Sequence, residues 1–146
     1  MKSSVRARNL IAGCALAATS ATAVAEVWIE TSRSDDYIAY GDPSSIRREG
    51  DISRMASMFD YKKPQAGIPG KTYFSTKRIY EYDCKQDRAR PLTVSSYSAH
   101  DAKGDTLASV SVNYNWSAVV RDSADAYLLK FACTRYDASQ GKLPGK

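Results

Sequence analysis

The segment RIYEYDCKQDRARPL, residues 78–92, contains the features on which the predicted fold depends. Tyr80, Tyr82 and Cys84 alternate with other residues, so their side chains point to the same side of an extended strand. The residues that follow, KQDRARP, have the composition of a turn. This turn is basic, with Lys85, Arg88 and Arg90. The segment therefore predicts a strand over 73–84 that ends at a cysteine and leads into a basic turn.

The first 25 residues are typical of a secretory signal peptide. Three basic residues precede a short apolar centre at residues 10–18, and small residues occupy the cleavage positions 23–25. The apolar centre is shorter than the about 20 residues that a helix needs to span a bilayer. We therefore expect export, cleavage before Glu26, and no integral membrane segment after the signal is removed.

A second cleavage site has to be weighed, because IAGC at residues 11–14 resembles a bacterial lipoprotein box. Acylation of Cys14 would anchor the protein. Arg8 lies close before Cys14, however, and leaves almost no apolar run ahead of this site. The choice decides between a protein free in the periplasm and one held at the outer membrane or cell surface, and the signal anatomy favours the first.

The mature chain carries little net charge. The full sequence of 146 residues has 21 Lys and Arg against 16 Asp and Glu, a formal charge of +5. Cleavage after residue 25 leaves 121 residues with 18 basic and 16 acidic side chains, a charge of +2. That length suits one domain, which we place at residues 26–133. The low charge argues against a nucleic-acid partner.

Two cysteines remain after the signal is removed, Cys84 and Cys133. An even pair in an oxidising compartment predicts a disulfide bond. A metal site lacks ligands, because His100 is the only histidine and neither cysteine belongs to a C-x-x-C pair. A redox-active dithiol also normally has close spacing. The predicted bond joins residues 49 positions apart and should stabilise the fold by about 4 kcal/mol.

The clearest strand pattern is LASVSVNYNW, residues 107–116. Apolar and polar residues alternate over its length, which predicts a strand with one buried and one exposed face. Other predicted strands are 27–31, 36–40, 52–61, 73–84 and 92–97. Turn residues connect them over short distances, which favours an antiparallel sheet of about six strands.

One segment has helical spacing, ADAYLLKFA at residues 124–132, with Asp122 or Ser123 as its cap. Its expected apolar face consists of Ala124, Tyr127, Leu128, Phe131 and Ala132. The helix should end at or just before Cys133, because a further regular turn would point that sulfur away from the apolar face. The sequence thus predicts an α+β fold in which one C-terminal helix packs on one sheet face, tethered by the disulfide. Residues 134–146 should form a flexible tail.

Catalytic signatures are weak. His100 sits beside Asp101 in a polar loop, and we expect a solvated turn residue there; catalysis would require a carboxylate and a serine next to it. The serines lack the flanking glycines of a nucleophile elbow, and the sequence contains no glycine-rich phosphate loop. We therefore predict a protein that is no enzyme and that uses neither cofactor nor metal.

Basic residues are the predicted binding residues. Lys85, Arg88 and Arg90 cluster beyond Cys84, and two more, Lys77 and Arg78, lie on the preceding strand with opposite parities. Such charges often only keep edges and loops solvated. The functional alternative is a patch that meets an acidic protein loop or a sulfated glycan. The cluster after Cys84 is favoured, because the disulfide would hold its start rigid and lower the ordering cost of binding.

The ten tyrosines suit contact surfaces. Those expected in the core are Tyr80, Tyr82, Tyr114 and Tyr127. Those expected nearer the surface are Tyr37, Tyr40, Tyr61 and Tyr97. A partly exposed aromatic face would suit a homodimer contact.

Several segments, in order from about Trp28 to Cys133, resemble the surface-adhesin protein E domain family of Gram-negative bacteria. They are YIAYGDPSSIRREGD, DYKKPQ, YFSTKRIYEYDCKQDRARPL, GDTL, a Trp after the last strand, and LLKFAC at the end of a short helix. The resemblance implies an antiparallel sheet with one helix tethered to its concave side by the Cys84–Cys133 bond.

The best-known member of that family is a dimeric outer-membrane lipoprotein that binds vitronectin, laminin and plasminogen of the host. The resemblance thus implies a non-enzymatic, exported, virulence-associated binding protein. The signal departs from the family pattern, because a lipid anchor is not favoured here. The alternative that needs no anchor is a periplasmic inhibitor or accessory protein of the envelope, for example one directed against a host hydrolase such as lysozyme.

Overall fold

The computed structural model describes residues 25–134, so the predicted signal peptide and tail lie outside the described residues except at their last and first positions. The strands are β1 (Ile29–Arg33), β2 (Tyr37–Gly41), β3 (Arg47–Glu49), β4 (Ile52–Ile68), β5 (Lys71–Asp83), β6 (Arg88–Tyr97), β7 (Thr106–Ser111) and β8 (Ser117–Ala118). The helices are the 3-10 turn η1 (Pro43–Ser45) and α1 (Ala124–Cys133). The predicted α+β class is confirmed.

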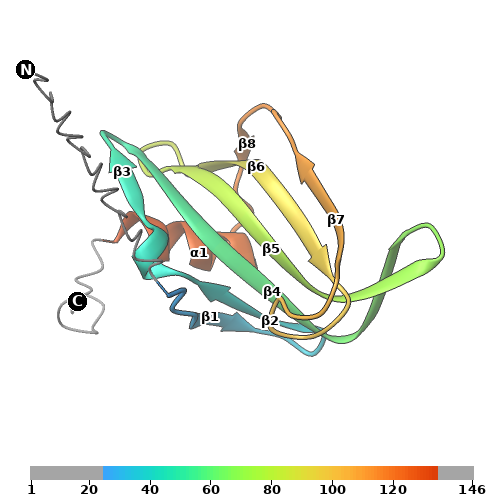
Figure 1. Ribbon diagram of the computed structural model, residues 1–146. Coiled ribbons are helices and arrows are strands. Elements are labelled where there is room, and N and C mark those ends of the chain that lie inside the picture. Colours follow the sequence, from blue (N-terminus) through green and yellow to red (C-terminus); the bar gives the residue numbers. More distant parts are fainter. Residues whose placement is uncertain (1–24, 135–146) are drawn as a thin grey trace, which may run out of the picture.

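One antiparallel sheet contains all the described strands, in the order β1-β2-β4-β5-β6-β7. The two remaining strands are short: β3 pairs with β4 and β8 pairs with β6, which brings the total to eight instead of about six. Segments of three and two residues are too short to show a period of two, which is why the sequence did not reveal them. The long β4 and β5 extend beyond the sheet as a two-stranded arm (Figure 1).

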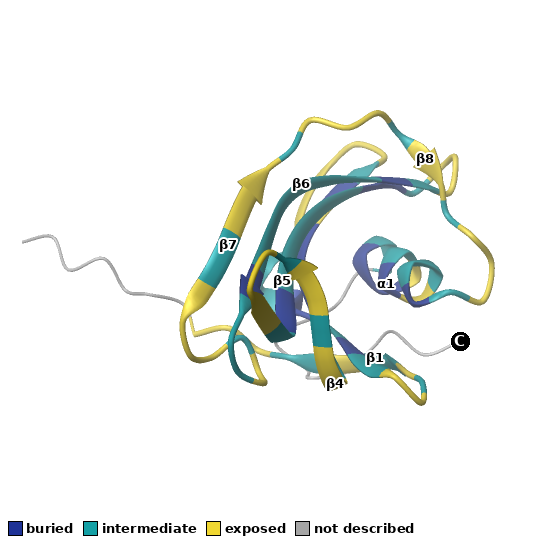
Figure 2. Ribbon diagram, turned by 90° about the vertical axis from the view of Figure 1, so that its right-hand side faces the viewer, coloured by how far each residue is buried: buried dark blue, intermediate teal, exposed yellow. Residues whose placement is uncertain are grey.

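The sheet curls around α1, so that one face is concave and encloses the helix (Figure 2). The core lies between them. From the sheet it contains Ala39, Met55, Phe59, Tyr82 and Ala89, and from the helix Ala124, Leu128, Phe131 and Ala132. Gly41 permits the close approach of the helix, because a Cβ at this position would lie only 2.8 Å from the Phe131 ring. We call this the helix-side face and the opposite one the outer face.

The ends of α1 match the prediction. Ser123 is the N-cap, and its hydroxyl accepts a hydrogen bond from the Ala126 N–H. Cys133 is the last helical residue. The expected apolar face was too wide, however, because Tyr127 is 46% exposed. Tyr127 follows Ala124 by three positions, which is a rotation of about 300° around the helix axis. Tyr127 therefore lies at the margin of the apolar face.

The Cys84–Cys133 disulfide is confirmed, with an S–S distance of 2.03 Å and a Cα–Cα distance of 5.6 Å. Two hydrogen bonds reinforce this end of α1. The buried Ser53 hydroxyl donates to the Ala132 carbonyl at 2.6 Å, and Arg48 donates to the Cys133 carbonyl at 2.8 Å. The C-terminal end of the helix is therefore fastened to β3, β4 and the end of β5.

The strand predicted over 107–116 is only partly right. The strand in this region is β7, at the sheet edge, and it ends at Ser111. Two of the apolar residues expected to be buried are exposed, Val110 to 52% and Tyr114 to 62%. The expectation that Tyr114 is a core residue is therefore wrong. Alternation shows which side chains share a side, but burial needs a covering element, and α1 packs against β1, β2, β4 and β5.

Candidate binding surface

The basic turn after β5 is ordered by one buried carboxylate, Asp83. It accepts hydrogen bonds from the backbone N–H groups of Lys85, at 3.1 Å, and Gln86, at 3.0 Å, and from the Arg88 guanidinium at 2.8 Å. The bond from Arg88 holds the pKa of the Asp83 carboxyl below its usual value, and the two backbone donors act in the same direction. These three bonds fix the conformation of the turn, and Lys85 projects from it into solvent.

The next basic side chain, Arg90, is also paired. Its Nη2 lies 2.6 Å from Glu81 Oε2, and its Cζ lies 4.7 Å from the centre of the Trp116 ring. Arg88 approaches the same ring at 5.6 Å. Arg88 and Arg90 therefore lie against one indole, and both have carboxylate partners. Trp116 precedes β8, and it was not identified from the sequence as a binding residue.

Lys77 and Arg78 point to opposite faces, as their parity predicts. Lys77 forms an ion pair with Glu26. Arg78 is on the helix-side face, where its Cζ lies 3.8 Å from the centre of the Phe59 ring and its Nη1 lies 3.8 Å from Asp125 Oδ1. The five predicted binding residues therefore do not form a single patch, because Arg78 is separated from the others by the sheet.

The outer face carries a row of charged side chains that crosses four strands. Arg54 points outward because its neighbours Ser53 and Met55 are buried on the helix-side face. It lies opposite Arg47 on β3 and Glu81 on β5, and Glu81 lies opposite Arg90 on β6. We missed Arg54 in the sequence, although a charged residue between two buried ones in a strand marks an exposed face.

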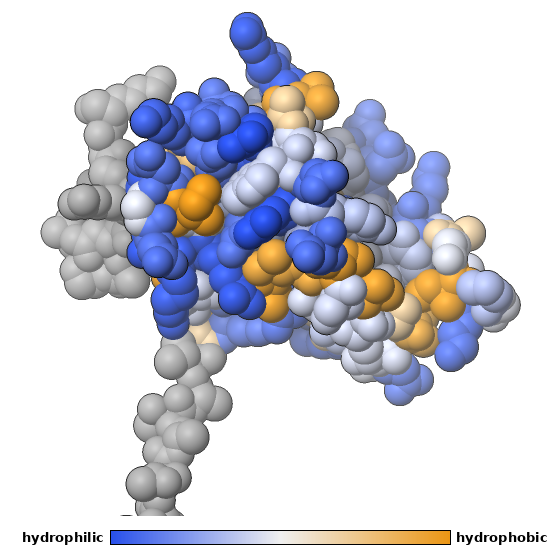
Figure 3. Space-filling model, turned by 90° about the horizontal axis from the view of Figure 1, so that it is seen from above, coloured by the Kyte–Doolittle hydropathy of each residue, from blue (hydrophilic) through white to orange (hydrophobic). Residues whose placement is uncertain are grey.

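A cavity of about 490 Å³ opens beside this row. Its lining residues are Ser45, Arg47, Arg48, Glu49, Ile52, Arg54 and Glu81. Three guanidinium groups thus share one cavity with two carboxylates. In the space-filling view of Figure 3, hydrophilic side chains likewise cover most of the visible face, with smaller hydrophobic patches between them.

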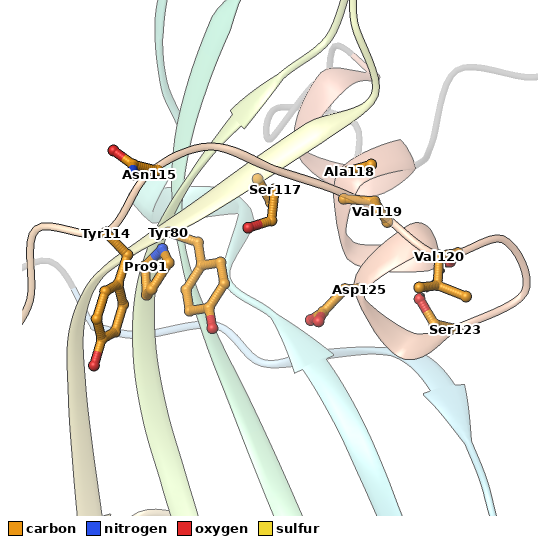
Figure 4. Close-up of a pocket in the computed structure, with 11 residues that line it drawn as sticks. Tyr80, Pro91, Tyr114, Asn115, Ser117, Ala118, Val119, Val120, Ser123 and Asp125 are labelled. Atoms are coloured by element: carbon orange, nitrogen blue, oxygen red, sulfur yellow. Dashed lines mark hydrogen bonds between the residues drawn. The ribbon is translucent and has the colours of Figure 1, made fainter.

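A second cavity, of about 460 Å³, lies on the helix-side face where α1 leaves the sheet uncovered. Tyr80, Pro91 and Tyr114 form one wall, and Ser123 and Asp125 at the start of α1 lie across from them (Figure 4). Burial raises the pKa of Tyr80, so its phenol stays neutral. The cavity therefore combines uncharged aromatic surface with a single carboxylate.

His100 does more than fill a solvated turn. Its Nδ1 lies 2.9 Å from Asp60 Oδ1, and its ring packs on Phe74 with 4.9 Å between centres. The buried Ser75 hydroxyl nearby donates to the Ala99 carbonyl and accepts from the Ala102 N–H. These contacts fasten the β6–β7 loop to β4 and β5. Among residues 25–134 no hydrogen bond joins His100 to a serine.

No three side chains among His, Cys, Asp and Glu come together to hold a metal ion in residues 25–134. Within the same range no helix is long and apolar enough to cross a membrane.

The model of the surface-adhesin protein E family matches residues 28–134 of this chain. The chain belongs to this family. The match includes all the described strands, α1 and both cysteines, and it agrees with the resemblance drawn from the sequence segments. Membership in a family of surface adhesins suggests a protein without catalytic activity. Comparison with functionally curated proteins finds no match.

Solved structures of protein E from Haemophilus influenzae share this adhesin-family fold. Crystal form II superposes with a TM-score of 0.52 at 13% identity, covering 77% of this chain and 98% of that one. The structure from a non-typeable strain has a TM-score of 0.50 at 15% identity, covering 77% of this chain and 76% of that one. At these identities the likeness concerns the fold alone.

Proposed function

We propose that the protein is an exported, non-enzymatic binding protein that attaches to extracellular-matrix proteins of a host, such as vitronectin and laminin, or to plasminogen. The observation that carries this proposal is the family match over residues 28–134, nearly the whole predicted mature domain. The paired arginines and the indole on the outer face support it, because this arrangement suits contact better than turnover. The proposal places the protein at the cell surface.

The contact surface that we propose consists of Lys85, Arg88, Arg90 and Trp116, with Lys77 farther along β5. Trp and Arg are the residue types that contribute most at protein interfaces. Asp83 and the disulfide already order the turn, so little conformational entropy remains to be lost on binding. Lys85, which has no carboxylate partner among the described residues, is the charge most available to a partner.

The test is binding of the purified mature protein to immobilised vitronectin, laminin and plasminogen, measured by surface plasmon resonance. We expect Trp116→Ala to weaken binding about tenfold, the effect of losing one interface hot spot. Lys85→Glu should weaken it as well, and added salt should lower the affinity. Lys63→Glu, the same charge change on the exposed arm of β4, is the matched control and should bind normally.

Two outcomes would refute this proposal. One is the absence of saturable binding to all three proteins, and the other is a protein found wholly in the periplasm after cell fractionation. Intact-mass analysis of the mature N-terminus in the same experiment distinguishes a start at Glu26 from an acylated Cys14. A stoichiometric complex with purified lysozyme would instead support the inhibitor alternative.

A further inference from the structure

We propose that Arg47 and Arg54 form a binding site for one carboxylate side chain of a protein partner. This inference rests on the proposed function only in that the protein acts by binding other proteins; it does not depend on which host protein is bound. The site lies in the outer-face cavity of about 490 Å³, on strands β3 and β4. It is distinct from the turn cluster that contains Lys85.

The first argument is the strand register. Arg47 and Arg54 are directly opposite each other in the antiparallel pair of β3 and β4. Side chains in such positions have Cβ atoms about 5 Å apart, and two like charges there destabilise the sheet. Among residues 25–134, neither guanidinium lies within ion-pair distance of a carboxylate. A pair of arginines that costs stability and has no internal anion is suited to an external one.

The nearest carboxylate in the row is already engaged. Glu81 lies opposite Arg54, but its Oε2 accepts from Nη2 of Arg90 at 2.6 Å and from Nε at 2.7 Å. The row therefore contains three guanidinium groups and one carboxylate. The charge that is left without a partner lies at the Arg47 and Arg54 end.

The second argument is that the site is preorganised. Nη1 of Arg47 donates to the carbonyls of Ser44, at 2.9 Å, and Ile46, at 2.8 Å. Ser44 belongs to η1 and Ile46 is its C-cap, and Asp42 caps the other end by accepting from the Ser44 N–H at 2.8 Å. Nη1 is thereby fixed, while the other donors of Arg47 remain for a ligand. Arg54 sits on β4, which pairs with strands on both sides.

The cavity lining indicates which anion fits. Glu49 and Glu81 line the same cavity as the arginines. A sulfated glycan, which carries many anionic groups, would bring some of them against these carboxylates. In a protein segment that has one acidic residue between basic ones, the carboxylate would pair with the two arginines and the basic side chains would pair with the two glutamates. A planar guanidinium can bind a carboxylate through two hydrogen bonds. The mixed charge thus favours a protein segment.

The experiment follows the arginine Nε–Hε resonances of the 15N-labelled mature protein by NMR. The probe is the peptide Ac-Lys-Gly-Glu-Gly-Lys-NH2 at millimolar concentration, and the control peptide has Gln in place of Glu. We expect the Arg47 and Arg54 signals to shift with the Glu peptide and not with the Gln peptide. Arg54→Gln should raise the peptide concentration that half-shifts the Arg47 signal about tenfold, the effect of losing one charge-assisted hydrogen bond. Lys63→Gln, a loss of the same charge on the exposed arm of β4, should leave the response unchanged.

A second measurement separates binding from a structural role. Since Arg54→Gln removes a like-charge contact, its urea midpoint should rise. A fall in this midpoint would show that Arg54 holds the sheet together and would overturn the proposal. So would equal shifts with the two peptides, or a heparin hexasaccharide that binds the pair at about tenfold lower concentration. Peptide binding without any binding to host matrix proteins would refute the proposed ligands and leave this site intact.

Discussion

Removal of the disulfide tests the architecture most directly. Replacing Cys84 and Cys133 with Ala opens a loop whose ends are 49 residues apart. In the chain-entropy model, the greater freedom of the unfolded chain lowers the free energy of unfolding by about 4 kcal/mol. Net stabilities of small domains are about 5–15 kcal/mol, so the double variant should lose a large share of its stability but still fold in the absence of denaturant.

The assay is equilibrium urea unfolding of the double variant and of the oxidised wild type, followed by circular dichroism. For an m-value of about 2 kcal/mol/M, the midpoint should fall by about 2 M. The helix signal should persist before the transition, because Leu128 is buried in the core and Ser53 still donates to the Ala132 carbonyl. Wild type reduced with dithiothreitol should behave as the variant does. A midpoint equal to that of the oxidised protein would refute the reasoning.

Three further changes test separate parts of the fold by the same unfolding assay. Leu128→Ala leaves a cavity beneath α1 and should cost about 2–5 kcal/mol, whereas Leu128→Ile should cost less; equal losses would contradict tight packing there. Ser123→Ala removes the N-cap and should cost about 1 kcal/mol, while Ser123→Asp should retain most of the stability. Because Arg88 lowers the folded-state pKa of Asp83, that carboxyl stabilises the protein above its unfolded pKa of about 3.9. The contribution is lost as pH falls through the lower, folded pKa, so Asp83→Asn should flatten the acid limb of a midpoint-against-pH plot; an unchanged limb would contradict the assignment.

Much of the architecture could be predicted because its signals are local. The helix is evident from the spacing around Leu128 and from its Ser123 cap, both of which depend only on neighbours along the chain. The disulfide follows from counting cysteines in an exported protein, and the family resemblance extends over the same region. The hydrogen bonds of Asp83 that order the turn after Cys84 were not expected.

The candidate site could be predicted only in part. Arg88 and Arg90 both lie against Trp116, but their ion pairs with Asp83 and Glu81 were not visible in the sequence. Glu81 and Arg90 are nine positions apart and meet only because β5 and β6 pair in one register. Register depends on the turn between the strands and on the buried faces of both, so no single segment reveals it.

The amino-acid sequence by itself determined the six longer strands in outline, the helix, the cysteine pair and the side of each strand on which a residue lies, because periodicity and cap chemistry act over a few neighbours. Only the tertiary structure decided which sides are covered. It leaves Val110 and Tyr114 exposed at an edge that α1 does not cover, and it places Arg47 against Arg54 across two strands. Burial and charge pairing depend on contacts between distant segments, and those contacts form only when the sheet curls around its helix.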